Sequence, residues 1–214
     1  MILSLRYAAI ALALGALPSA VPGFAQTAPD ASTQQAAAKL AENLCASCHG
    51  ADGRGDNPRV PRIAGQQCAY IEVQLKAFRS QSRGDRAAHE YMWGVAATLD
   101  DNVVAALAQY FAAQAPAAGT PPQDATEAAA AAAGKQLFEK GSPERGVAPC
   151  AACHGANAEG MSVFPRLAGQ HREYLFIQLQ SIRNKLRDSP VMHGLTKELT
   201  DAEIVALATY LQSK

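Results

Sequence analysis

A pentapeptide pattern occurs twice in this chain and restricts its possible folds more than any other feature. Residues 45–49 read Cys-Ala-Ser-Cys-His, and residues 150–154 read Cys-Ala-Ala-Cys-His. Two cysteines one helical turn apart, followed at once by a histidine, form the attachment signature of c-type haem. The spacing suits the chemistry because the two thiols can add to the two vinyl groups on one porphyrin edge. The imidazole then comes under the ring centre, where it can bind iron.

The motifs therefore predict two haem c groups, each with one iron. The predicted attachment residues are Cys45 and Cys48 for one group and Cys150 and Cys153 for the other, with His49 and His154 as iron ligands. A bare cysteine pair can also be a redox dithiol or half of a zinc site. A redox dithiol belongs near a βαβ pattern, which this sequence lacks. A zinc site leaves the histidine after each pair unexplained.

The sequence around each motif is duplicated as well. Pro-Arg-Ile-Ala-Gly-Gln at 61–66 returns as Pro-Arg-Leu-Ala-Gly-Gln at 165–170, and Tyr70, Gln74 and Leu75 return 104 positions later. Residues 114–125 are rich in Pro, Ala and Gly, which is typical of a linker. We interpret the chain as a signal peptide (1–25), an N-terminal domain (26–113), this linker and a C-terminal domain (126–214), each domain carrying one haem.

The fold class expected is all-α, because alanine is abundant and β-branched runs are few. We predict helices over 34–44, 66–80 and 126–140, and one at the end of each half. Ser32 or Thr33 is expected to cap the first helix, and Asp100 and Thr200 the two last ones. Glycines 84 and 94 suggest that residues 81–98 are irregular.

Residues 1–25 have the features of a secretory signal peptide. Arg6 provides the positive start, and the apolar stretch 8–17 is short for a membrane span, although a retained anchor is the alternative. Export to the periplasm fits the chemistry, since c-type haem is attached outside the cytoplasm. Nineteen basic and nineteen acidic residues balance, so no nucleic-acid partner is expected.

Two methionines are the candidates for the second axial ligand of each iron. Met92 and Met192 both precede the last predicted helix of their half, and a methionine–histidine pair is a common ligand set that raises the reduction potential. Met161 follows the second motif too closely to reach round the ring. His89 and His193 are weaker competitors, because they do not occupy equivalent positions in the repeat.

Residues near the motifs can support the ligands. The carbonyls of Pro61 and Pro165 can accept a hydrogen bond from the motif histidines. Arg62 and Arg166 follow directly and can either pair with haem propionates or face solvent. Cys68 is the one cysteine outside the motifs. It is expected to be a small, partly buried helix residue, with an intermolecular disulfide or a reactive thiol as alternatives.

Taken together, residues 36–213 resemble cytochrome c4, a family of periplasmic dihaem cytochromes built from two class I cytochrome c domains. The most telling segments are CAACHG at 150–155, FPRLAGQ at 164–170 and LTDAEI at 199–204. The resemblance implies His49 with Met92 and His154 with Met192 as ligands. It also implies two all-α domains that face each other, and electron transfer from quinol-oxidising complexes to terminal oxidases. The first half differs most from the family pattern, at residues 90–93 and at Cys68.

The predicted function is therefore that of a one-electron carrier with redox protein partners, associated with the periplasmic face of the membrane, and not that of an enzyme. No set of catalytic acid, base or nucleophile is apparent. Two alternatives remain open at this point. One is an electron-accepting subunit of a dehydrogenase, such as a flavocytochrome. The other is a dihaem peroxidase, which the two matched methionines disfavour.

Overall fold

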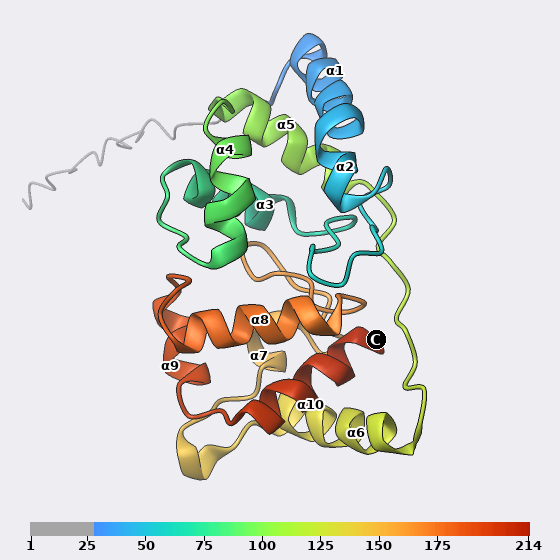
Figure 1. Cartoon of the computed structure of the whole chain (residues 1–214), viewed down its shortest axis with the longest axis vertical. Helices are drawn as coiled ribbons and strands as arrows, with labels where there is room; N and C mark the ends of the chain where they lie inside the picture. Colours follow the sequence, from blue (N-terminus) through green and yellow to red (C-terminus); the bar gives the residue numbers. More distant parts are fainter. Residues whose placement is uncertain (1–27) are drawn as a thin grey trace, which may run out of the picture.

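The computed structural model describes residues 28–214, so the predicted signal peptide lies outside the described residues. Within this part of the chain the regular structure is helical, and the only β pairings are three isolated bridges. The predicted all-α class is confirmed. Figure 1 shows two groups of helices stacked one above the other, with the N-terminal half above and the C-terminal half below.

The N-terminal half begins with an unbroken helical run that ends in the first motif. The run comprises α1 (Ala31–Leu40), a π-helical turn η1 (Ala41–Cys45) and α2 (Ala46–His49). The helical elements that follow are α3 (Cys68–Arg79), a second π-helical turn η2 (Ala88–Met92), α4 (Trp93–Ala96) and α5 (Asp101–Ala112). The run includes the predicted helix 34–44 and continues through the first motif to His49. Asp100 caps α5 by accepting a hydrogen bond from the Val103 N–H at 2.8 Å.

Two local predictions in this half are wrong. The cap of α1 is Asp30 and not Ser32 or Thr33: its carboxylate accepts from the Thr33 N–H at 2.7 Å and from the Ser32 hydroxyl at 2.8 Å. A carboxylate makes a stronger, charge-assisted cap than a hydroxyl. The segment predicted to be irregular contains η2 and α4, because packing against α3 outweighs the cost of Gly94 in a short helix.

The C-terminal half repeats the plan. It contains α6 (Ala125–Lys140), a 3-10 turn η3 (Pro143–Arg145), α7 (Ala151–His154), α8 (Arg172–Arg183), α9 (Pro190–Thr196) and α10 (Asp201–Gln212). Thr200 and Glu203 form the predicted capping box at the start of α10. In each half the first and last long helices pack together, α1 on α5 and α6 on α10. At Gly134 the α6 backbone comes so close to α10 that a Cβ would collide with the Ala206 carbonyl.

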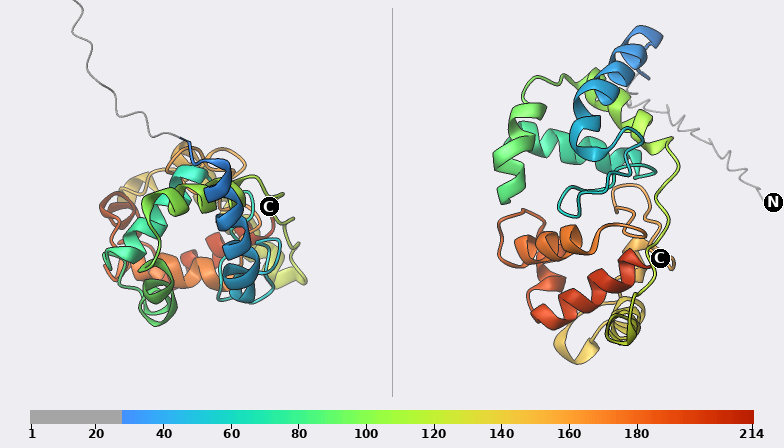
Figure 2. Two further views of the ribbon diagram at one scale, coloured as in Figure 1. Left: turned by 90° about the horizontal axis from the view of Figure 1, so that it is seen from above. Right: turned by 45° about the vertical axis from the view of Figure 1, so that its right-hand side comes forward.

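Each half has its own hydrophobic core. One core gathers around Val104, Leu107 and Phe111, and the other around Phe138, Ile204 and Leu207. Residues 113–124 connect α5 to α6 without helix and run along one side of both halves (Figure 2). This connection is held to the last helix, where the Thr120 N–H donates to the Gln212 carbonyl at 2.8 Å. Within residues 28–214, no helix has the length and apolar character needed to cross a bilayer.

Candidate functional site

The two cysteine–histidine motifs have the same local geometry. The first motif ends a long helical run and the second forms a single helical turn, and in both the cysteines lie one turn apart and the histidine is the last helical residue. Gly50 and Gly155 follow with φ angles of 80° and 82°, a conformation that only glycine adopts readily. The chain then turns back, and the N–H groups of Gly55 and Gly160 donate to the carbonyls of His49 and His154, both at 2.8 Å.

Both motif imidazoles are held by a proline carbonyl. Nδ1 of His49 lies 2.8 Å from the Pro61 oxygen, and Nδ1 of His154 lies 3.0 Å from the Pro165 oxygen. A carbonyl can only accept, so Nδ1 carries the proton and Nε2 keeps its lone pair. Burial lowers the pKa of both histidines, and the hydrogen bond to proline partly opposes that change. The result is a neutral imidazole with a fixed tautomer, as iron ligation requires.

The residues fit a covalently bound haem. Nε2 of His154 is buried and has no hydrogen-bond partner among residues 28–214, which is costly unless another group binds it. The motif thiols are unpaired, and burial raises the pKa of Cys150 to about 11. Among the described residues, no three His, Cys, Asp or Glu side chains gather as a metal cluster. Each cysteine pair is followed by a single imidazole, which matches a haem with one iron.

Met92 and Met192 occupy equivalent places. Met92 ends η2 and Met192 lies in α9, each half-buried and nine residues before the start of the last helix of its half. Met161 is 57% exposed. The competing histidines have other surroundings: His89 is exposed and makes an edge-to-face contact with Trp93, and Nδ1 of His193 lies 3.2 Å from the Ile182 carbonyl oxygen. Ligation by Met92 and Met192 stays a prediction.

Arg62 and Arg166 lie where the two halves meet. Nη1 of Arg62 donates to the Gly169 carbonyl at 2.7 Å. Nε of both arginines is buried and has no partner within the part of the chain that the structure describes. These free donors leave the predicted pairing with propionates possible, and it stays a prediction. Cys68 is the first residue of α3 and is half-buried against the N-terminal core. Its Sγ lies 3.8 Å from a carboxylate oxygen of Glu72.

The contact between the halves includes a buried cluster of polar and charged side chains that the sequence motifs do not predict. Arg83 and Arg187, 104 positions apart, form an antiparallel bridge and are nearly buried. The side-chain oxygens of Gln74 and Gln178 each accept from both guanidinium groups, at 2.8–2.9 Å.

Arg83 also pairs with Asp85 at 2.6 Å. The hydroxyls of Tyr70 and Tyr174 complete the cluster by accepting from the arginine of the opposite half. The sequence repeat shows that Tyr70 and Gln74 have equivalents in the other half, but it does not predict that these residues lie at an interface.

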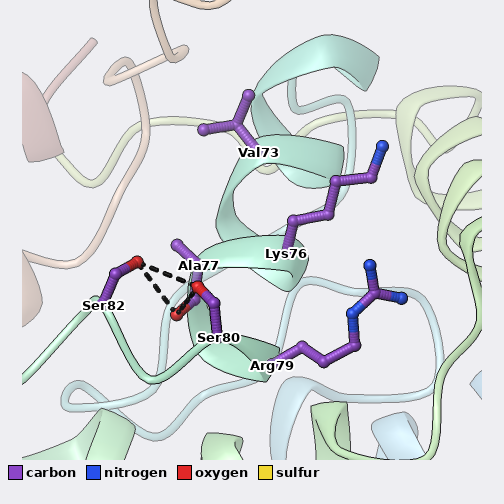
Figure 3. A pocket seen from close by; sticks show the side chains of 6 residues that line it. All are labelled: Val73, Lys76, Ala77, Arg79, Ser80 and Ser82. Carbon is purple, nitrogen blue, oxygen red and sulfur yellow. Dashed lines mark hydrogen bonds between the residues drawn. The ribbon is translucent and has the colours of Figure 1, made fainter.

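A separate hollow lies on the surface of α3. Figure 3 shows its lining of Val73, Lys76, Ala77, Arg79, Ser80 and Ser82, with Ser80 and Ser82 hydrogen-bonded to each other. None of the predicted haem residues takes part. We assign this hollow no role in the site.

Comparison with known proteins gives a consistent result. The family model for cytochrome c matches this chain twice, over residues 34–114 and 131–214. Cytochrome c4 of Thiocapsa roseopersicina is 37% identical over 89% of this chain and 97% of its own length. The thiosulfate dehydrogenase electron acceptor of Thiomonas intermedia is 33% identical over 94% of this chain and 88% of its own. The solved structure of cytochrome c4 from Acidithiobacillus ferrooxidans superposes with a TM-score of 0.74 at 39% identity, covering 79% of this chain and 98% of that one.

Two tandem helical domains, each with a Cys-x-x-Cys-His helix end and a neutral, carbonyl-held imidazole, define a dihaem c-type cytochrome that carries electrons. With these relatives, the chain belongs to the cytochrome c4 family. It binds two haem c groups covalently, as the tandem domains imply.

Proposed function

We propose that this dihaem cytochrome acts in the periplasm as a one-electron carrier of a respiratory chain, between a quinol-oxidising complex and a terminal oxidase. The observation that supports it is that each half holds a motif histidine by a proline carbonyl and places a half-buried methionine, Met92 or Met192, at an equivalent position. Methionine–histidine ligation keeps iron six-coordinate and raises its reduction potential. The haem groups supply the redox chemistry, and the chain attaches, ligates and buries them.

The first test is the long-wavelength absorption band of the oxidised, mature protein, expressed per haem. This band reports methionine sulfur bound to ferric iron. Full intensity for two haems is expected if Met92 and Met192 both bind. Half intensity means that one haem has another ligand or an open site, which would contradict the carrier assignment for that haem and favour a peroxidase.

A second candidate is an electron-accepting partner of a dehydrogenase. It is supported by the relative named a thiosulfate dehydrogenase electron acceptor. Affinity purification of the tagged protein from its native cells separates the two roles. A stoichiometric dehydrogenase in the eluate indicates the second role, whereas a free dihaem protein that is rapidly oxidised by membranes containing the terminal oxidase indicates the first.

The periplasmic location depends on cleavage of the predicted signal peptide before Gln26. Mass spectrometry of the haem-containing protein from a periplasmic extract tests it directly. A mature N-terminus at Gln26 is expected, and a chain that keeps residues 1–25 in the membrane fraction would show a retained anchor instead.

A further inference from the structure

Each half of the molecule places a glutamine beside the peptide group that holds the other half's haem histidine. Gln170 in the C-terminal half faces the backbone of Arg62, and Gln66 in the N-terminal half faces the backbone of Arg166. Both glutamines are buried, at 6% and 7% exposure. They occupy equivalent positions in the repeat, so the two contacts are related by an approximate two-fold axis.

The contact in the first half forms a continuous hydrogen-bonded chain. The Arg62 N–H donates to Oε1 of Gln170 at 2.9 Å. The same peptide group contains the Pro61 carbonyl, whose oxygen lies 2.8 Å from Nδ1 of His49. The chain therefore runs from the His49 imidazole, through one peptide unit, to a side chain of the other domain.

The second half repeats the arrangement in the opposite direction. The Arg166 N–H donates to Oε1 of Gln66 at 2.7 Å, and the Pro165 carbonyl of the same peptide accepts from Nδ1 of His154 at 3.0 Å. The orientation of each glutamine amide is fixed. Its Nε2 donates to the Arg62 or Arg166 carbonyl, and its Oε1 also accepts from the N–H of the next residue in its own chain segment. If either amide were flipped, its NH2 group would point at two backbone N–H groups, and neither of those could then be accepted.

We propose that Gln170 and Gln66 are positioning residues that tune the reduction potential of the haem in the opposite domain. A peptide that donates through its N–H becomes a better acceptor at its carbonyl, because hydrogen bonds in a chain polarise one another. A stronger acceptor at Nδ1 gives the imidazole more electron density at Nε2, which favours ferric over ferrous iron. Each glutamine therefore lowers the potential of the haem across the interface.

This inference rests on His49 and His154 as iron ligands, as proposed above. The test uses the full, haem-loaded protein with Gln170→Met and Gln66→Met, which keep side-chain length and remove the polar atoms. Gln170→Met is expected to raise the potential of the N-terminal haem alone, and Gln66→Met that of the C-terminal haem alone. We expect a several-fold change in the ferrous-to-ferric ratio at fixed applied potential, where a tenfold change corresponds to about 59 mV for one electron.

Two further variants separate tuning from loosening of the interface. Gln67→Ala removes a neighbouring contact between the halves, from Gln67 Nε2 to the Glu159 carbonyl at 3.0 Å, without touching either proline–arginine peptide. It is expected to leave both potentials unchanged. Gln170→Glu keeps an oxygen for the Arg62 N–H, and is expected to produce no upward shift.

A second readout is the Nδ1 proton of each haem histidine, followed by NMR in the reduced protein. In Gln170→Met the His49 proton is expected to move upfield and to exchange faster with solvent, while the His154 proton stays in place. The proposal is overturned if the shift occurs in the haem of the mutated domain, if both haems shift equally, if the potential falls, or if Gln67→Ala has the same effect. A failure of histidine ligation itself would appear separately, in the absorption spectrum of the unaltered protein.

Discussion

Replacement of Asp85 by alanine is expected to destabilise the protein strongly. The Asp85 and Arg83 side chains are 1% and 7% exposed and lie 2.6 Å apart. Arg187 shares Gln74 and Gln178 with Arg83, so the cluster contains two buried guanidinium groups and one buried carboxylate. Removal of one partner of a buried ion pair costs about 3–5 kcal/mol, because it leaves a charge without compensation. At about 1.4 kcal/mol per factor of ten, the unfolding equilibrium constant should rise at least about a hundredfold.

Equilibrium denaturant unfolding of the haem-loaded protein measures this change. Arg86→Ala is the matched control, because Arg86 also pairs with an acidic residue, Glu90, at 2.6 Å but its side chain is 85% exposed. An exposed pair of this kind is worth less than about 1 kcal/mol. If Asp85→Ala costs no more than the control, the buried charge is compensated by another group, and the reasoning from burial is wrong.

Three other perturbations have defined outcomes. Met192→Ala should lower the potential of the C-terminal haem by a large margin, since a soft ligand to ferrous iron is lost; an unchanged redox titration would refute the ligand assignment. Glu203 has its pKa lowered from 4.5 to about 2 by the hydrogen bond from Arg145, so its stabilising effect is present above about pH 4.5 and is lost as the pH falls to about 2. Glu203→Gln should therefore flatten the fall in unfolding free energy over that range, as measured by acid titration of stability. Replacement of the four motif cysteines by serine should give a haem-free protein without a sharp melting transition, because each half has only a modest core of its own; a cooperative melt in circular dichroism would contradict this.

Much of the fold followed from local sequence patterns. The caps at Asp100 and Thr200 depend on residues three positions away, and the proline carbonyls follow the motif histidines by only 12 and 11 residues, so these features were predictable from short segments. The first helix start was missed because three possible capping residues, Asp30, Ser32 and Thr33, stand close together, and the carboxylate outcompetes the two hydroxyls.

The interface could not be predicted from the sequence, because its contacts join residues of the two different halves. Arg83 and Asp85 resemble residues of a solvated loop in the sequence, and charged residues are rarely buried unless they are paired. The acceptors that make burial of Arg83 possible, Tyr174 and Gln178, lie 91 and 95 residues away. The sequence repeat shows that Gln66 and Gln170 are equivalent. Only the packing of the two halves brings Gln66 beside the Arg166 backbone and Gln170 beside the Arg62 backbone.

The position of Asp85 has a consequence for the symmetry of the molecule. A dimer of identical chains must place every residue on both sides of its two-fold axis. Here the position 104 residues after Asp85 is Ser189, and within residues 28–214 Arg83 pairs with a carboxylate whereas Arg187 does not. Because both copies are on one chain, the difference between Asp85 and Ser189 gives the two sides of the interface cluster unequal charge, while the two arginines still share Gln74 and Gln178. An internally duplicated chain can thus carry a charge on one side only of its internal interface, which a symmetric dimer cannot.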